Sequence, residues 1–325
     1  MSETTQMATQ MPTQMHEFID RLRVSPYIRE RRFGDISSFN FTRQAFYSGH
    51  WDDVTTKARG LFINTRTEQI VARGYDKFFN VDENPQTTMD ELRRKLVYPV
   101  EVYRKENGFL GLISWDHNKD DFFFATKSMI EGPYADTLKH IFFHSGINTN
   151  AVKAFLSKWN VTMVVEVIDP AFDPHIIEYS EAKLVLLDII GNYLNPIYMI
   201  YPLLVQRALE FRMDFKKHER TVMAWEDVEY LKWYCSHPQS GFDVSGKPFE
   251  GYVLRDGMGY MVKLKTAYYL KWKKYRWQAD RIMHGQPLPA PEPDAFLLWV
   301  EQNKDKLAGK SIIDMRNMYE QTHTT

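Results

Sequence analysis

EGYVLRDGMGYMVKLKT, residues 250–266, is the stretch of sequence that decides the fold. Two runs of alternating residues flank Asp256-Gly257, a pair that is favoured in the tight turns of β-hairpins. Successive side chains of a strand point to opposite faces of the sheet, so residues two apart share a face. The stretch therefore predicts an antiparallel hairpin in which Lys263 and Lys265 project together from one face.

Strand and helix patterns extend through the rest of the chain. Runs rich in β-branched and aromatic residues predict strands, and near-continuous apolar runs predict strands at the centre of a sheet. The run just before Lys105 is expected to pair with the run that follows Asn107-Gly108. These patterns predict an α+β fold with mostly antiparallel sheets flanked by helices. Strands are expected at 59–65, 68–73, 97–104, 110–115, 121–126, 161–168 and 184–190, and helices at 18–32, 134–143, 150–159, within 200–233 and from 267 onward.

Composition limits the class of protein. The chain has 325 residues, of which 44% are hydrophobic and 26% charged, as is ordinary for a globular protein. The net charge of −1 favours no particular partner, so any nucleic-acid site must come from a local basic patch. The single cysteine, Cys235, excludes disulfide frameworks and cysteine-based zinc sites. No apolar run approaches the roughly 20 residues of a membrane span, and we expect a cytoplasmic protein with no membrane partner.

Three charged residues lie at unusual places in predicted strands. Lys105 stands where the run EVYRK ends and the turn residues ENG begin. Glu166 interrupts the apolar run VTMVVEVI, and Glu250 begins the hairpin. Taken alone, Glu166 can be structural, and the lysine pair of the hairpin can form a solvated sheet face.

Taken together, these charges indicate chemistry on a nucleotide. A nucleophilic lysine needs an unprotonated amine, which neighbouring cations favour by depressing its pKa. Lys263 or Lys265 is a better candidate for that cation than Arg104, which strand alternation turns away from Lys105. Two acids could bind a metal ion and the ribose of a nucleotide, and paired lysines could bind its phosphates.

At this point the sequence resembles a family, the covalent nucleotidyltransferases, which comprise ATP-dependent DNA and RNA ligases and mRNA capping enzymes. KENG at residues 105–108 matches the KxxG motif of this superfamily. That motif alone is a weak signal, but the whole set of motifs occurs in the superfamily's order and with similar spacing. Segments on either side of the KxxG motif look like those of the tRNA-repair RNA ligase of T-even bacteriophages and of the ligase domain of fungal tRNA ligases. The motifs are KENG (105–108), VVEVIDP (164–170), KLVLLDII (183–190), EGYV (250–253) and KLK (263–265), with ARGLFIN (58–64), DKFFNVDENP (76–85) and FATKSM (124–129) as the more specific segments.

The resemblance implies roles for the residues of the superfamily motifs. Lys105 would attack the α-phosphorus of ATP and form a lysyl-AMP, and Gly108 would let the backbone approach the nucleotide closely. Glu250 would bind Mg²⁺, for which Mn²⁺ can substitute, directly or through water. Lys263 and Lys265 would orient the triphosphate and stabilise the charge of the phosphate in transfer.

The more specific segments imply further contacts. Arg59, Lys77 and Lys127 would contact the phosphates of ATP or the 5′-phosphate of RNA, and Glu166 would hydrogen-bond the ribose. Phe79 would support the loop that carries Lys77, although simple packing is an alternative for Phe79, and a surface position is an alternative for Lys127.

The segment after Lys265 separates classes within the superfamily. DNA ligases and capping enzymes usually carry an OB-fold there, a barrel that needs five strands. The 60 residues here have helical patterns interrupted by PLPAPEP, so we expect a small helical C-terminal module and no OB-fold. The domain organisation predicted is a disordered tail (1–15), a nucleotidyltransferase domain (16–266) and the helical module (267–325).

Basic residues are dense at the start of this module. Lys271, Lys274 and Arg281 make one stripe of a helix, while Tyr268 and Trp272 begin an apolar stripe on another face. The basic stripe can be a track for an RNA backbone, or the helix can be an amphipathic core helix with a solvated outer face. Both interpretations can hold together.

The hypothesis from sequence is an ATP-dependent RNA ligase that joins 5′-phosphate and 3′-OH ends in RNA or tRNA repair. Gly309-Lys310-Ser311 lacks the earlier glycine and preceding strand of a P-loop, so no kinase module is expected and separate end-healing enzymes would be needed. A monomer is expected, in a bacterial or phage-infected cell. The alternatives are another polynucleotide ligase or nucleotidyltransferase, or a non-catalytic RNA-binding module on a ligase scaffold.

Overall fold

A computed structural model describes residues 3–288 and 294–323 of the chain. The described chain divides into two compact units, each built from segments that are separate in sequence. In this division the strand of Lys105 and the C-terminal helices belong to the same unit, and the domain boundary expected after residue 266 stays a prediction. The first unit contains Met1–Gln86, Phe109–Ile168 and Lys183–Lys216, and the second contains Thr87–Gly108, Asp169–Ala182 and Lys217–Thr325.

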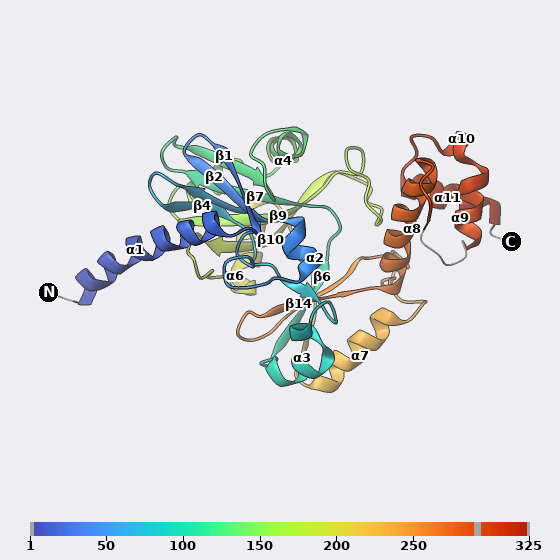
Figure 1. Cartoon of the computed structure of the whole chain (residues 1–325), viewed down its shortest axis with the longest axis horizontal. Helices are drawn as coiled ribbons and strands as arrows, with labels where there is room; N and C mark the ends of the chain where they lie inside the picture. Colours follow the sequence, from blue (N-terminus) through green and yellow to red (C-terminus); the bar gives the residue numbers. More distant parts are fainter. Residues whose placement is uncertain (1–2, 289–293, 324–325) are drawn as a thin grey trace. The chain divides into compact units, whose positions relative to one another are not determined.

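The first unit is built on two β-sheets (Figure 1). One has the strand order β1-β2-β3-β4, and the other has the order β11-β10-β9-β7-β8. All pairs are antiparallel except that of β10 with β11, so the predicted α+β class with mostly antiparallel sheets is confirmed for this unit. The strands are β1 (Ile28–Phe33), β2 (Ile36–Phe41), β3 (Leu61–Asn64), β4 (Gln69–Arg73), β7 (Phe109–Asp116), β8 (Asp121–Thr126), β9 (Val161–Ile168), β10 (Lys183–Gly191) and β11 (Asp214–Phe215). The residues of this unit also include the short strand β5 (Phe79–Asn80), which belongs to neither of these two sheets.

Helices cover the outer faces of these sheets. The apolar face of the five-stranded sheet packs against α4 (Pro133–His144), α5 (Thr149–Leu156) and α6 (Tyr201–Phe211) in a buried cluster that includes Met163 and Val165 of the central strand. Helix α1 (Glu3–Val24) packs its last turns on the four-stranded sheet. Helix α1 begins within the segment expected to be a tail. The remaining helix of this unit is α2 (Arg43–Ser48), and the 3₁₀ turn η1 (Pro85–Thr87) ends its first segment.

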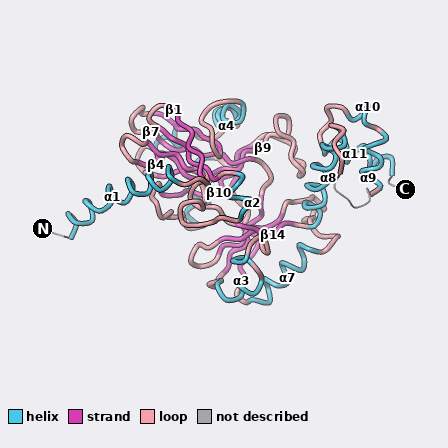
Figure 2. The backbone as a smooth tube through the Cα atoms, viewed as in Figure 1, coloured by secondary structure: helices cyan, strands magenta, loops and turns pink. Residues whose placement is uncertain are grey.

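The second unit contains a sheet in which β12, β6, β13 and β14 are neighbours in that order. The hairpin predicted from EGYVLRDGMGYMVKLKT is confirmed as β13 and β14, and β13 also pairs with β6. Figure 2 draws these strands, with β14 labelled, in magenta. After it, the described chain forms helices whose apolar residues share one buried cluster. The elements are α3 (Met89–Lys95), β6 (Val100–Lys105), β12 (His218–Val222), α7 (Trp225–Ser236), β13 (Gly251–Arg255), β14 (Met261–Lys265), α8 (Ala267–Met283), α9 (Ala295–Gln302), α10 (Lys304–Leu307) and α11 (Ile312–His323).

Two of the expected features, one helix and one strand pairing, are wrong. The helix expected over 18–32 ends at Val24, and Ile28–Phe33 forms β1 in a hairpin with β2. Its sequence, IRERRF, is charged on both faces because β1 is an exposed edge strand, so the period of two is hidden. The expected pairing across Asn107-Gly108 is also wrong, since β6 pairs with β12 and β13 while β7 pairs with β8 and β9.

Among the described residues, no helix combines the length and apolar content needed to cross a membrane.

Gly251 is a position that only glycine can occupy. Its φ is 151°, and a Cβ built there would lie 2.0 Å from the backbone oxygen of Leu264 on the neighbouring strand. A side chain at this position would therefore push β14 away from β13. The glycine in EGYV is required by the close approach of the two strands.

We predict that Gly251→Ala destabilises the second unit by more than the roughly 1–2 kcal/mol that a left-handed backbone alone costs a residue with a Cβ. The matched control is Gly246→Ala, which also has a positive φ, of 76°, but has no atom within 4 Å of the added Cβ. Urea unfolding monitored by tryptophan fluorescence measures both variants. Equal losses of unfolding free energy in the two variants would contradict the steric argument.

Candidate active site

Three neighbouring strands of the second unit bring Lys105, Glu250 and Lys265 together. In the strand register Gly251 lies opposite Lys105 on β6 and opposite Lys265 on β14. The residue before it, Glu250, is 2% exposed and reaches both lysines. The Glu250 carboxylate lies 3.1 Å from Lys105 Nζ and 2.9 Å from Lys265 Nζ, one oxygen to each amine.

The electrostatics of this triad follow from burial and proximity. Burial alone would raise the pKa of Glu250, but the positive charges of Lys105 and Lys265 outweigh it and hold that pKa below its usual value. Burial lowers the pKa of Lys265, and the charge of Glu250 opposes that shift. The buried carboxylate is thus kept ionised between two amines.

Asn107, the third residue of KENG, fixes this arrangement, and the sequence analysis missed it. Its side-chain Nδ2 donates to Glu250 at 2.9 Å, and its Oδ1 accepts from the backbone N–H of Ile177 at 3.1 Å. Its own N–H donates to the hydroxyl of Tyr179 at 2.9 Å, and that hydroxyl donates to Glu106. Asn107 was interpreted only as a turn residue, because none of these partners is near it in sequence.

Two further cations, Lys263 and Arg104, lie in other surroundings. Lys263 lies two residues before Lys265 on the same face of β14, opposite Val253 of β13, as the alternation predicts. Arg104 forms ion pairs with Glu219 at 2.7 Å and with Asp243 at 3.0 Å. Of the two lysines that the sequence offered as the cation beside Lys105, Lys263 and Lys265, it is Lys265 that shares the Glu250 carboxylate with Lys105.

Tyr269, at the start of α8, is a second residue that the sequence analysis missed. Lys265 Nζ lies 4.6 Å from the centre of the Tyr269 ring, an arrangement that stabilises a cation. Burial raises the pKa of the Tyr269 hydroxyl to about 12, so it stays protonated. The predicted apolar stripe that follows in α8 packs inward, since Trp272, Tyr275 and Ala279 belong to the buried cluster of the C-terminal helices.

The first unit gathers four further predicted residues. Glu166, on the central strand β9, is 9% exposed. Burial lowers the pKa of Arg59, and the negative charge of Glu166 opposes that shift. The pKa of Lys127 is lowered by burial and by the charge of Arg59. The pKa of Lys77 is lowered by burial, with Arg59 and Lys127 adding to the shift against the opposing charge of Glu83. Arg59 is therefore within electrostatic range of Glu166, Lys77 and Lys127.

The loop of Lys77 is built around aromatic rings. Lys77 Nζ lies 3.7 Å from the centre of the Phe79 ring and 5.3 Å from that of Trp51, and 3.3 Å from a carboxylate oxygen of Glu83. Phe79 thus packs against Lys77, as expected of a supporting residue. Gly108 comes three residues after Lys105, the last residue of β6, and its proposed approach to a nucleotide stays a prediction.

The donor set limits how a metal ion could be held. Among the described residues no group of three or more His, Cys, Asp or Glu side chains is arranged to hold a metal. In the second unit the residue predicted to bind a metal ion is Glu250, and each of its carboxylate oxygens faces a lysine amine. Mg²⁺ is commonly held by one or two carboxylates together with substrate phosphates and water. The residues therefore fit a metal that arrives with a nucleotide and is held by Glu250 in part.

We predict that Glu250→Gln lowers the unfolding free energy by about 3–5 kcal/mol at neutral pH, because it removes a buried carboxylate and leaves two half-buried amines without their partner. Since the folded pKa of Glu250 is depressed, its contribution is complete above the unfolded value of roughly 4.3 and is lost as pH falls through the folded value. The gap between wild type and variant should shrink below that pH in urea titrations. The control, Glu301→Gln, removes an exposed carboxylate paired with Lys304 and should cost under about 1 kcal/mol. A gap that does not change with pH would refute this account.

Comparison with known proteins was made against families, curated sequences and solved structures. A family model described as RNA ligase matches residues 57–269. The tRNA ligase of Candida albicans is 25% identical over 272 residues, which is 71% of this chain and 32% of that protein. The tRNA ligase 1 of Schizosaccharomyces pombe is 25% identical over 311 residues, which is 85% of this chain and 37% of that protein. The chain therefore spans about a third of the length of these relatives.

Two solved structures share the fold. A putative ATP-dependent DNA ligase from Aquifex aeolicus has a TM-score of 0.55 at 13% identity, covering 95% of this chain and 75% of that one. An archaeal ATP-dependent RNA ligase has a TM-score of 0.53 at 11% identity, covering 93% of this chain and 73% of that one. The similarity confirms the nucleotidyltransferase fold of ligases.

Proposed function

The chain belongs to the RNA ligase family, and we propose that it joins RNA ends in an ATP-dependent reaction through a lysyl-AMP intermediate. The observation that carries the proposal is the Lys105–Glu250–Lys265 triad, which puts one lysine at a strand end beside a second cation. The proposal is supported by the same motifs that give the family match. The names of the relatives favour tRNA as the RNA that is joined.

The first step takes place at Lys105 Nζ. The unprotonated amine attacks the α-phosphorus of ATP, a P–N bond forms, the bond from the α-phosphorus to the bridging oxygen breaks, and pyrophosphate leaves. The amine loses a proton to solvent. Glu250, 3.1 Å from Nζ, orients the amine, and Lys265 provides positive charge where the phosphate charge develops.

Two transfers complete the reaction. An oxygen of the RNA 5′-phosphate attacks the same phosphorus, the P–N bond breaks and the Lys105 amine takes up a proton as it leaves. The 3′-OH then attacks the RNA phosphorus, loses its proton, and AMP departs as the phosphodiester forms. Mg²⁺, or Mn²⁺ in its place, would neutralise phosphate charge while held in part by Glu250.

The remaining residues are assigned supporting roles. We assign Lys263 to the triphosphate together with Lys265, Glu166 to the ribose, and Arg59, Lys77 and Lys127 to phosphates. The helices after Lys265 would form the small C-terminal module, with no OB-fold, and the basic stripe of α8 would face RNA. End-healing would come from separate enzymes, and the ligase would act as a monomer.

The test of the proposed function uses two RNA substrates with Lys105→Ala. The variant should fail to take label from ATP labelled at the α-phosphate and fail to seal 5′-phosphate RNA, but it should still seal RNA that is already adenylylated, because the lysine is needed only to transfer AMP. Lys95→Ala, an exposed lysine of the same unit, is the control and should behave as wild type. Labelling of Lys105→Ala at the wild-type level would exclude this nucleophile.

Replacing either lysine of β14 tests the roles assigned to Lys263 and Lys265 at the triphosphate. Lys263→Ala and Lys265→Ala should each lower the rate of self-adenylylation by about 100-fold or more, the scale on which loss of one transition-state contact acts. Lys247→Ala, an exposed lysine in the turn before β13, should have no effect. Unimpaired labelling in either β14 variant would remove that lysine from the site.

A non-catalytic RNA-binding module is the alternative. It predicts RNA binding by the wild type with no label from ATP or GTP, after treatment with pyrophosphate to clear any bound AMP. The intact triad favours catalysis, because a binding module has no need of a buried carboxylate between two amines.

A further inference from the structure

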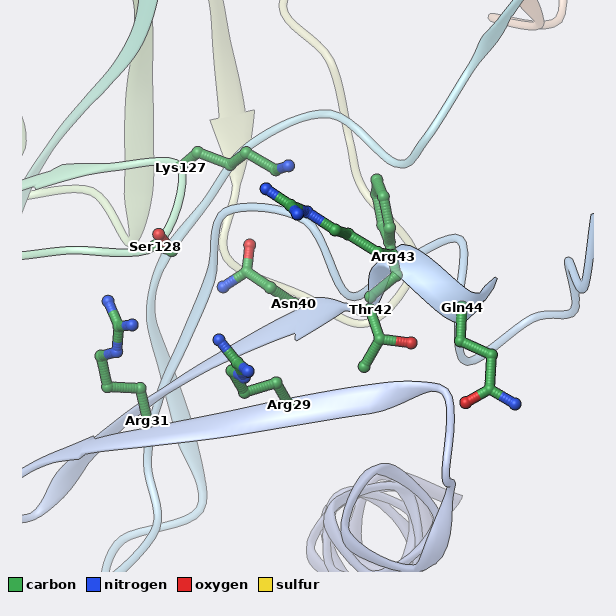
Figure 3. Close-up of a pocket in the computed structure, with 9 residues that line it drawn as sticks. Arg29, Arg31, Asn40, Thr42, Arg43, Gln44, Lys127 and Ser128 are labelled. Carbon is green, nitrogen blue, oxygen red and sulfur yellow. The ribbon is translucent and has the colours of Figure 1, made fainter. Parts of the chain in front are cut away.

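A basic pocket of the first unit lies outside the residues assigned above, except for Lys127. It has a volume of about 530 Å³ and is formed by β1, β2, the start of α2 and the loop after β8. Figure 3 shows Arg29 and Arg31 rising from β1, with Arg29 below Asn40, and Arg43 extending toward Lys127. The lining residues are Arg29, Arg31, Asn40, Phe41, Thr42, Arg43, Gln44, Lys127 and Ser128.

Strand geometry places the arginines of β1. Arg29 and Arg31 are two residues apart and share a face, and their partners on β2 are Asn40 and Ser38. Their Cα atoms are separated by about 6.6 Å, the length of two strand residues. This face therefore presents two guanidinium groups spaced along a line, with a polar strand beside them.

The pocket has positive charge without a matching negative charge. It is lined by four cations and by no acidic side chain. Within the described part of the chain, Arg29 and Arg43 form no ion pair, and Arg31 donates a hydrogen bond to the sulfur of Met129. By contrast, Arg32 on the opposite face of β1 is paired with Glu30 at 3.3 Å. Like charges held this close favour an anion, which would relieve their repulsion.

The kind of anion follows from what the pocket offers. Guanidinium groups bind phosphate oxygens with paired hydrogen bonds. The volume is larger than one phosphate group requires and lies within the range of nucleotide-sized sites. The ring of Phe41 is already engaged, by Lys127 Nζ at 4.8 Å and by Trp51 at a ring-centre distance of 5.1 Å. The pocket thus offers donors for phosphates, and the one aromatic residue that lines it already contacts Lys127 and Trp51.

Lys127 links this pocket to the residues assigned to the reaction. Its amine points into the pocket in Figure 3, and its charge is also coupled to Arg59 and Lys77. Phosphates bound by Arg29, Arg31 and Arg43 would therefore continue from those bound by Lys127. All these residues belong to the first unit.

We propose that Arg29, Arg31 and Arg43 bind consecutive backbone phosphates of the single-stranded RNA that is to be sealed, next to the phosphates contacted by Lys127. The proposal rests on the proposed function for the identity of the ligand. Such contacts position the RNA without reading its sequence. They extend the substrate site to the hairpin of β1 and β2.

The test is RNA binding by the triple variant Arg29→Gln, Arg31→Gln and Arg43→Gln. Fluorescence anisotropy with a labelled 5′-phosphate RNA of 18 nucleotides is measured over a range of salt. Affinity should fall at least about tenfold, the equivalent of one charged hydrogen bond. The slope of log affinity against log salt should fall by up to about 2, since each single-strand phosphate contact contributes about 0.7. Both losses should be the same for RNAs of different sequence.

The control is Arg32→Gln on the other face of β1, which should keep wild-type affinity and salt slope. Thermal unfolding should give the same midpoint in all variants, because the three arginines are exposed. Unchanged affinity and slope in the triple variant, or an equal fall with Arg32→Gln, would overturn the proposal. Self-adenylylation, which involves no RNA, reports separately on the proposed function: wild type that takes no label would refute the ligase while the salt slopes still decide whether the pocket binds RNA.

Discussion

A carboxylate buried between two lysines is the constraint on which the second unit depends. Glu250 is almost fully enclosed, and a buried charge is tolerated only when it is paired and hydrogen-bonded. Lys105 and Lys265 supply the charges, and Asn107 supplies the further donor. The three strands must approach closely for this to happen, which makes the glycine after Glu250 necessary. The contacts that stabilise the second unit are thus the same contacts that position the residues proposed for the reaction.

The same arrangement explains why these residues suit nucleotidyl transfer. A lysine at the end of β6 is held by a carboxylate and accompanied by a second amine, so it is oriented before a substrate arrives. Within the first unit, Arg59, Lys77 and Lys127 form a separate group of cations whose pKa values are lowered by burial. A polyanion with its metal would compensate charges that the protein leaves only partly balanced. The basic pocket of the β1–β2 hairpin would compensate the charge of a longer anion in the same way.

Sequence reasoning predicted what local patterns encode. The alternation of β13 and β14 and the apolar runs of β9 and β10 gave the strands, and the motif order gave the lysines and Glu250. It could not predict β1, whose exposed edge carries charges on both faces, and so the arginines of the pocket were missed. Nor could it predict Asn107, because its partners Ile177 and Glu250 are 70 and 143 residues away. Contacts of that range depend on the fold and leave no local pattern.

The central claim is that Lys105 carries the AMP, and the most direct measurement is to locate that group. The protein is incubated with ATP and Mg²⁺, digested under conditions that preserve the P–N bond, and analysed by tandem mass spectrometry. The account predicts the mass of one adenylyl group on Lys105. Adenylyl groups on Lys263 or Lys265 instead, or on no lysine of a protein that still seals RNA, would contradict it.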